Sequence, residues 1–288
     1  MEKQVTRNDH TSVLGFAVCL FIVLSQASSF VFSRMQTKTD AAACYLTAIV
    51  LQTVSAVIPY FIISARYGRG AGYSMPEKEE AALVIPLFLS LYFTYYISSL
   101  MCSTVFGSPD ANTPLIPAGP EDPLLFTLTV IYYVIAPAIL EELLFRRAMI
   151  NAILPYGKWF AVMISSLLFA MSHWDRTRVI PVFIFSFFLA VIYIETDNLT
   201  VSSVIHLLNN TFAFAGLYMS SGFDQDTSSS VMMSAAVAGF VCFIILAVTL
   251  PLGSIFSPDG RTAAVKKDFW SYPVVIAFLA YILLLALH

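Results

Sequence analysis

Residues 124–153 read LLFTLTVIYYVIAPAILEELLFRRAMINAI, an apolar run interrupted by two adjacent glutamates and two adjacent arginines. A helix that crosses a membrane needs about 20 consecutive apolar residues, so this run is long enough to span a bilayer. A charge near the centre of such a helix costs roughly 2.5–3.5 kcal/mol on insertion scales. The two glutamates, Glu141 and Glu142, therefore need compensating groups around them or a functional reason to be there.

The composition of the whole chain agrees with that of this run. Of its 288 residues, 58% are hydrophobic and only 11% are charged, and the mean hydropathy is +0.80. The apolar residues form blocks of helix length rather than the short alternating strands of an outer-membrane barrel. The sequence predicts an all-α, polytopic transmembrane bundle of about eight or nine spans, as one integral membrane domain over residues 1–288. The candidate blocks are 13–33, 44–65, 81–106, 124–153, 158–173, 179–195, 199–219, 231–250 and 270–287.

Lysine and arginine in the connections between blocks predict the orientation, because these residues favour the cytoplasmic side. An N-terminus in the cytoplasm is favoured, since one set of connections then holds most of the positive charges. That set contains Lys3, Arg7, Arg66, Arg69, Lys78, Arg146, Arg147, Lys158, Arg261, Lys266 and Lys267, and the opposite set contains Arg34, Lys38, Arg176 and Arg178. The fifth and sixth blocks are short enough to form a re-entrant pair instead, which would change the number of spans.

Several other protein classes find little support in the sequence. The net charge of −3 and the lack of a basic stripe argue against nucleic-acid binding. The cysteines form no CxxC pair, so neither a zinc knuckle nor a disulfide framework is expected. The first apolar block is long and has no clear cleavage site, and we expect it to remain as a span.

Helix geometry assigns different roles to the two glutamates. Glu142 and Arg146 are four residues apart and share one helix face, so they can form an ion pair that compensates both charges. Glu141 is turned away from that pair, and its neighbour four residues on is Phe145. Glu141 is thus the carboxylate left over, and in apolar surroundings it is a candidate general base. The alternative is that both carboxylates only join helices through the two arginines.

Polar residues also interrupt two later apolar blocks. Phe169 and His173 lie one turn apart, so the ring can shield the imidazole, although a histidine at a helix end could equally be an interfacial anchor. His206 and Asn210 are four residues apart, so both side chains face one neighbour. Two uncharged donors that converge on one point are what an oxyanion hole needs. Hydrogen bonding between helices is the alternative for this second pair.

The patterns EExxxR, FxxxH and HxxxN follow one another on these blocks and resemble the three motifs of the CPBP (Abi) family. That family groups type II CAAX prenyl endopeptidases with bacterial proteins linked to bacteriocin maturation and immunity. The resemblance extends over residues 137–211, about a quarter of the chain, inside the core helices of 124–219. It implies a glutamate-type intramembrane endopeptidase of a bacterial inner membrane. The expected partners are the lipid bilayer and a membrane-embedded or lipid-anchored peptide or protein substrate, and no cofactor is expected.

The resemblance also implies a role for each polar side chain. Glu141, as the principal base, and His173 would together activate a water molecule. His206 and Asn210 would stabilise the oxyanion of the tetrahedral intermediate. Glu142 and Arg146 would hold the site together.

Two alternatives and one departure from the family remain. Glu141, His173 and His206 would also make a zinc site with two histidines and one carboxylate, although the sequence has no HExxH helix. A transporter or an immunity protein could use the same charges as a proton relay or a binding site. Arg147 stands where the family often has a small residue, a difference that concerns local packing or substrate choice more than the chemistry.

Overall fold

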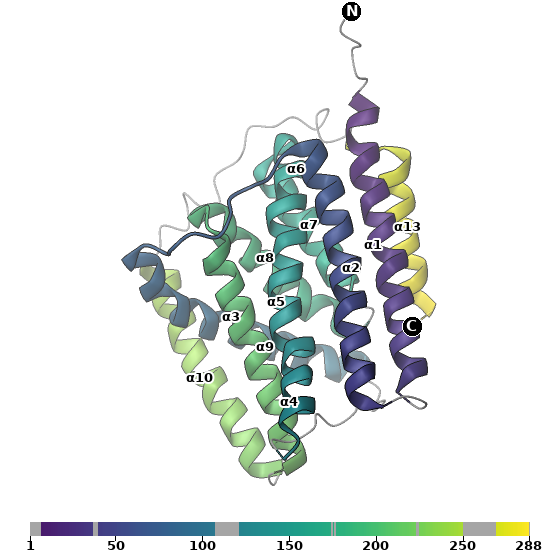
Figure 1. The fold of residues 1–288 in the computed structure, drawn as a ribbon. Coiled ribbons are helices and arrows are strands. Elements are labelled where there is room, and N and C mark those ends of the chain that lie inside the picture. Colours follow the sequence, from purple (N-terminus) through teal and green to yellow (C-terminus); the bar gives the residue numbers. More distant parts are fainter. Residues whose placement is uncertain are drawn as a thin grey trace, which may run out of the picture.

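The chain folds into helices and connections throughout the part that the structure describes (Figure 1). This computed structural model describes residues 7–36, 40–106, 121–173, 175, 177–222, 225–249 and 269–287. No strand occurs within these ranges, and the predicted all-α class is confirmed. Part of the predicted charge asymmetry lies outside the described residues, because these do not include Lys3, Lys38, Arg176, Arg261, Lys266 and Lys267.

Each apolar block of the sequence corresponds to one helix or to one run of consecutive helical segments. The first three blocks are α1 (Arg7–Met35), α2 (Ala41–Tyr67) and α3 (Lys78–Phe106). The fourth is a continuous run made of α4 (Pro123–Val130), η1 (Ile131–Ile135), α5 (Ala136–Glu141), η2 (Glu142–Ile150), α6 (Asn151–Ile153) and η3 (Leu154–Tyr156). The others are α7 (Lys158–Met171), α8 (Val179–Thr196), α9 (Leu199–Gly222), α10 (Gln225–Thr249) and α13 (Tyr272–Leu287).

Among the described residues, six helical segments are long and apolar enough to cross a membrane. They are Thr11–Met35, Ala41–Tyr67, Lys78–Phe106, Pro123–Tyr156, Val179–Thr196 and Asp226–Thr249. α7 and residues Tyr272–Leu283 of α13 are apolar but shorter, and α9 carries the polar residues His206, Asn209 and Asn210 in its middle. The chain is therefore an integral membrane protein with several spans. The predicted eight or nine spans would require two or all three of α7, α9 and α13 to cross as well.

The helices at the two flanks of the bundle pack through glycines. α1 and α13 lie side by side on one flank, and α10 packs against α3 on the other (Figure 1). A Cβ atom on Gly15 of α1 would lie 2.4 Å from the backbone of Pro273, and one on Gly239 of α10 would lie 2.1 Å from the Leu89 carbonyl oxygen. Only a residue without a side chain allows backbones to approach this closely, as is common between membrane helices.

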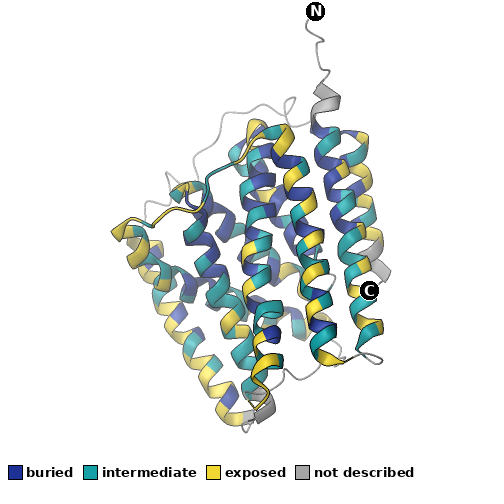
Figure 2. Cartoon of the chain, in the orientation of Figure 1, coloured by how far each residue is buried: buried dark blue, intermediate teal, exposed yellow. Residues whose placement is uncertain are grey.

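Burial is greatest in the middle of the bundle, whereas α10 exposes much of its surface (Figure 2). The exposed residues of α10 include Val237, Val241 and Val248, whose apolar side chains suit a lipid-facing surface. Fully buried side chains gather on η2 and α7, among them Phe145 and Phe169. The segments that carry Glu142, Arg146 and Phe169 thus lie in the enclosed part of the bundle.

The run from α4 to η3 is not a regular α-helix. Its hydrogen bonding is π-helical in η1, just before Pro137, and again in η2, which follows Glu141. A proline has no N–H for an intrahelical hydrogen bond, and π-helical turns occur frequently at functional sites. The Ser165 hydroxyl of α7 donates to the Phe145 carbonyl oxygen over 2.9 Å. This hydrogen bond ties the irregular segment to α7, the helix that leads to His173.

Candidate active site

Glu142 and Arg146 form a fully buried ion pair on η2. The Arg146 Nε atom lies 3.4 Å from Glu142 Oε2, and neither side chain is exposed. The Arg146 Nη2 group also donates to Ser186 Oγ of α8 over 3.1 Å, and its guanidinium lies 4.9 Å from the centre of the Phe169 ring. The pair agrees with the four-residue spacing in the sequence. It joins η2 to α7 and α8, since a buried arginine needs both an opposite charge and hydrogen-bond acceptors.

His206 lies between the two glutamates. Its Nδ1 atom is 3.1 Å from Glu142 Oε1, and because an ionised carboxylate only accepts, Nδ1 carries the proton in this hydrogen bond. Its Nε2 atom is 3.7 Å from Glu141 Oε2, which is longer than a hydrogen bond. The rings of Phe169 and Phe185 lie 5.7 Å from the imidazole and exclude water from its sides. The second nitrogen of His206 therefore faces the Glu141 carboxylate without bonding it directly.

The exposure of Glu141 distinguishes it from Glu142. The Glu141 side chain is 23% exposed, whereas that of Glu142 is fully buried. Glu142 is shared between Arg146 and His206, so its charge is compensated from two directions. Glu141 is the carboxylate that water or a substrate can reach from outside the cluster.

His173 lies at the exposed end of α7. Its Nδ1 atom is 3.0 Å from the Phe169 carbonyl oxygen of the preceding turn. Since a carbonyl oxygen only accepts, Nδ1 donates, and in the neutral ring Nε2 then has a lone pair available as a base. The Phe169 ring lies 5.0 Å from His173 and 5.7 Å from His206, so it links the two histidines. The contact of Glu141 with an imidazole is made with His206 rather than with His173.

Asn210 is half-buried on α9, one turn beyond His206. No hydrogen bond joins its side-chain amide to another group in the described part of the chain. The structure thus brings Glu141, Glu142, Arg146 and His206 into one cluster. His173 is connected to that cluster through Phe169, and Asn210 lies on the same helix as His206.

The described residues contain no group of three His, Cys, Asp or Glu side chains placed to hold a metal ion. The zinc alternative requires Glu141, His173 and His206 to converge on one point. Glu141 and His206 approach each other, but among the described residues His173 is not close enough to both of them to complete such a group. A three-ligand zinc site would therefore require a rearrangement at the end of α7.

Ser186 belongs to the cluster but was not among the residues predicted from the motifs. It accepts the hydrogen bond of Arg146 from α8, and it is fully buried. The sequence carried a signal, because Ser186 is the one polar residue between Val179 and Ile192 of an otherwise apolar helix. A buried hydroxyl in such a helix is expected to bond a polar partner on a neighbouring helix.

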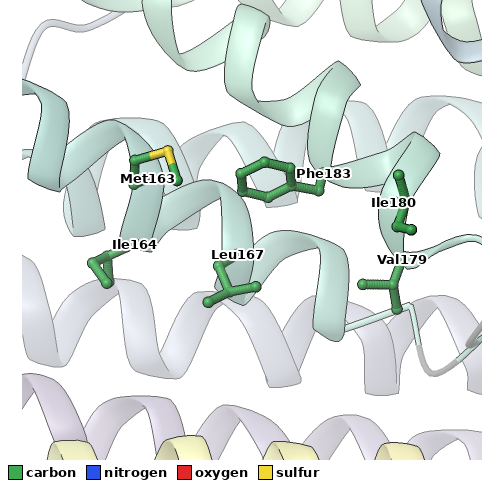
Figure 3. A pocket seen from close by; sticks show the side chains of 6 residues that line it. All are labelled: Met163, Ile164, Leu167, Val179, Ile180 and Phe183. Carbon is green, nitrogen blue, oxygen red and sulfur yellow. The ribbon is translucent and has the colours of Figure 1, made fainter. Parts of the chain in front are cut away.

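A shallow apolar depression of about 340 Å³ lies between α7 and α8 (Figure 3). It is lined by Met163, Ile164, Leu167, Val179, Ile180 and Phe183. None of these side chains can donate a proton or activate water. The depression is therefore separate from the chemistry of the charged cluster, and its lining suits hydrocarbon.

Comparison with known proteins finds a family whose model matches the core of the chain. Residues 123–212, about a third of the chain, match the family described as Rce1-like, the type II CAAX prenyl endopeptidases. No curated protein and no solved structure matches the chain at a significant level. The matched segment runs from α4 to the middle of α9 and includes every residue of the three motifs. The resemblance predicted from those motifs is confirmed, and at family level the match supports a CAAX-type membrane peptidase.

Proposed function

We propose that this chain, whose core is that of the Rce1-like CAAX endopeptidases, hydrolyses a peptide bond of a membrane-associated substrate with water activated by Glu141 and His173. The observation that carries the proposal is the difference between the two adjacent glutamates. Glu142 is buried and compensated by Arg146 and His206, whereas Glu141 is partly exposed. A carboxylate in an apolar bundle that is not used for structure is a functional group by default.

The charges of the cluster suit a residue that gains and loses a proton. Glu142 and Arg146 cancel each other, which leaves Glu141 and His206 as a carboxylate and an imidazole 3.7 Å apart. Because Arg146 already compensates Glu142, a proton taken up by Glu141 leaves the buried ion pair unchanged. Glu141 can therefore accept a proton while Glu142 and Arg146 stay ionised.

In the proposed hydrolysis, each polar side chain of the site has one role. Glu141 takes a proton from water, and the water oxygen attacks the carbonyl carbon of the scissile bond. The resulting oxyanion would be stabilised by the Asn210 amide and by Nε2–H of protonated His206. The C–N bond then breaks as the proton held by Glu141 passes to the leaving nitrogen. His173, through its Nε2 lone pair, would help to orient the attacking water.

The name of the matched family suggests the class of substrate. We propose a peptide that is anchored to the bilayer by a lipid on a cysteine near its C-terminus. A bacteriocin-like peptide or a membrane protein without such a lipid is the other possibility implied by the CPBP resemblance.

Isotope labelling tests the reaction and the substrate class together. The purified protein would be incubated in H₂¹⁸O with a farnesylated peptide ending in cysteine, two aliphatic residues and serine, and with the same peptide lacking the lipid. The proposal predicts one ¹⁸O atom in the new C-terminal carboxylate of the farnesylated peptide, and none with the Glu141→Ala protein. Cleavage of both peptides at equal rates would exclude a lipid requirement, and label incorporation that persists in Glu141→Ala would contradict the role of Glu141.

The same preparation separates hydrolysis without a metal from hydrolysis by zinc. We expect cleavage to continue after dialysis against a strong chelator, with no stoichiometric zinc in the active protein. Stoichiometric zinc whose removal abolishes cleavage, and whose return restores it, would show that Glu141 and the histidines act as ligands instead.

A further inference from the structure

Residues 68–77 connect α2 to α3 without forming a helix, and we call them the strap. The strap crosses the end of the bundle near α6 before it reaches the start of α3 (Figure 1). Much of it is exposed, as Figure 2 shows, yet it is held by hydrogen bonds to three separate helical elements. A connection of this length that only joined two helices would not need such contacts.

The first of these elements is the helical run that carries the two glutamates. The Gly70 N–H donates to the Arg147 carbonyl oxygen over 3.0 Å, and Arg147 Nε donates to the Gly70 carbonyl oxygen over 3.3 Å. The Asn151 amide donates to the Tyr67 carbonyl oxygen over 3.0 Å, just before the strap begins. Arg147 is also the residue that departs from the family pattern. Its side chain holds the strap next to the segment that begins at Glu142.

α8 and α9 hold the next part of the strap. Tyr193 Oη donates to the Ala71 carbonyl oxygen over 3.2 Å, and the Leu199 N–H donates to the Gly72 carbonyl oxygen over 3.1 Å. Thr200 Oγ1 donates to the Ser74 carbonyl oxygen over 2.7 Å. These contacts fix the strap against the ends of the helices that carry Ser186 and His206.

Two glycines allow the strap to lie this close. A Cβ atom on Gly70 would be 2.5 Å from Tyr193 Oη and 3.0 Å from the Arg147 carbonyl oxygen. A Cβ atom on Gly72 would be 3.0 Å from Arg147 Nη2. The side chain of any other residue at position 70 would push the strap away from α8 and η2.

Tyr73 brings the strap to the active-site helix. Its hydroxyl lies 3.4 Å from Ser203 Oγ, and Ser203 is buried on α9 one turn before His206. Burial raises the pKa of the Tyr73 phenol, and the negative charge of Glu142 raises it further, although the hydrogen bond from Ser203 lowers it. The phenol therefore keeps its proton at neutral pH. The residue is 49% exposed, so part of its ring is free to contact another molecule.

We propose that the strap closes this end of the Glu141 and His206 site, that Arg147 holds it in place, and that Tyr73 contacts the bound peptide as a specificity-determining residue. The role of Tyr73 toward a peptide rests on the proposed function. The closing of the site by the strap is independent of the proposed function, because it depends only on contacts within the chain.

The accessibility of Ser203 tests the strap without any need for catalysis. A Ser203→Cys thiol would be labelled with a water-soluble maleimide in a protein whose native cysteines Cys19, Cys44, Cys102 and Cys242 are replaced by alanine. We expect Arg147→Met to raise the labelling rate about tenfold, the effect of losing one charge-assisted hydrogen bond. Arg69→Met removes an exposed arginine from the same strap and is expected to change nothing. Equal rates in all three proteins, or an equal rise with both substitutions, would overturn the proposal.

A milder variant guards against a folding defect in Arg147→Met. Tyr193→Phe removes only the hydroxyl that bonds the strap, and we expect it to raise the labelling rate severalfold, in line with the smaller worth of a hydrogen bond between neutral groups. An unchanged rate in a folded Tyr193→Phe protein would count against strap closure by these contacts.

Protection from labelling tests the contact of Tyr73 with the peptide. The experiment uses Glu141→Ala protein with Ser203→Cys, so that the farnesylated peptide can bind without being cleaved. The peptide should slow labelling when Tyr73 is present and should protect much less in Tyr73→Ala. Equal protection in both proteins, or no protection in either, would overturn the role of Tyr73. Loss of the ¹⁸O reaction in the wild type would instead refute the proposed function and leave the labelling result for Arg147 standing.

Discussion

Two halves of the charged cluster differ in how they are held. The closed half, consisting of Glu142, Arg146 and Ser186, is fully buried and is joined by an ion pair and a hydrogen bond across two helices. The open half, consisting of Glu141 and His173, is partly exposed. In the open half, the imidazole of His173 bonds only a carbonyl oxygen of its own helix within the described residues. Burial thus fixes one half as a scaffold, while the other can be reached by water and substrate.

The largest expected effect is the loss of the base in the open half. Glu141→Gln keeps the shape of the side chain but cannot accept a proton, so we expect cleavage to fall about 10²–10⁴-fold, the usual contribution of a general base. The thermal unfolding midpoint in detergent should hardly change, because Glu141 makes no direct hydrogen bond to His206. Glu79→Gln, which removes an exposed carboxylate from α3, is the matched control. A Glu141→Gln protein that unfolded much more readily would place Glu141 in the closed half.

The closed half should respond in the opposite way. Glu142→Gln leaves the Arg146 charge buried without its partner, so we expect the free energy of unfolding to fall by about 3–5 kcal/mol. Cleavage should fall as well, because a neutral amide oxygen is a weaker acceptor for His206 Nδ1–H than the carboxylate. The double variant Glu142→Gln with Arg146→Met removes both charges and should recover part of the stability. Denaturation in detergent measures both proteins, and a double variant less stable than the single one would contradict this account.

His173→Ala is expected to reduce cleavage by about 10²-fold, at the lower end of the range for general acid–base residues. Its effect on stability should be small, because the side chain is exposed and bonds only the Phe169 carbonyl. His10→Ala offers a control substitution of a histidine far from the motifs in the sequence. Cleavage at the wild-type rate in His173→Ala would show that His206, and not His173, assists Glu141.

The smallest expected effect concerns the ring that lies between the halves. Phe169→Leu removes the aromatic face above Arg146, and we expect a loss of about 2 kcal/mol of stability, the worth of a desolvated cation–π contact. Phe183 on α8 lines the apolar depression instead, so Phe183→Leu serves as the control. Chemical denaturation of the two variants gives the comparison, and equal losses in both would mean that the contact with Arg146 contributes nothing specific.

The positions of the helices could be predicted from the sequence because a bilayer requires long apolar runs, which end at charged or Pro-rich and Gly-rich segments. The ion pair of Glu142 and Arg146 could be predicted because both lie on one helix, where spacing fixes the distance. Contacts between different helices could not be predicted from residue spacing in this way. His206 lies 64 residues from Glu142 in sequence, and only the packing of α9 against η2 places its ring between the two glutamates.

The strap and the irregular segment η2 show the same limit. The strap begins with Gly68, Arg69 and Gly70, a composition typical of a loop, and nothing in it indicates that the chain is bonded to η2, α8 and α9. The irregular hydrogen bonding of η2 also depends on its neighbours, since Ser165 bonds the Phe145 carbonyl from another helix. Local patterns therefore predicted the elements and the chemistry within one helix, and tertiary packing determined the rest.

Our central proposal is that the protein hydrolyses a peptide bond in the membrane, with Glu141 as the base that activates water. Its most direct test compares the peptides and membrane proteins of cells that express the wild type with those of cells that express Glu141→Ala at the same level. The account predicts a defined set of new C-termini that occur only with the wild type and return when Glu141 is restored. Identical peptide sets in the two cell populations, with full biological activity in Glu141→Ala, would contradict it.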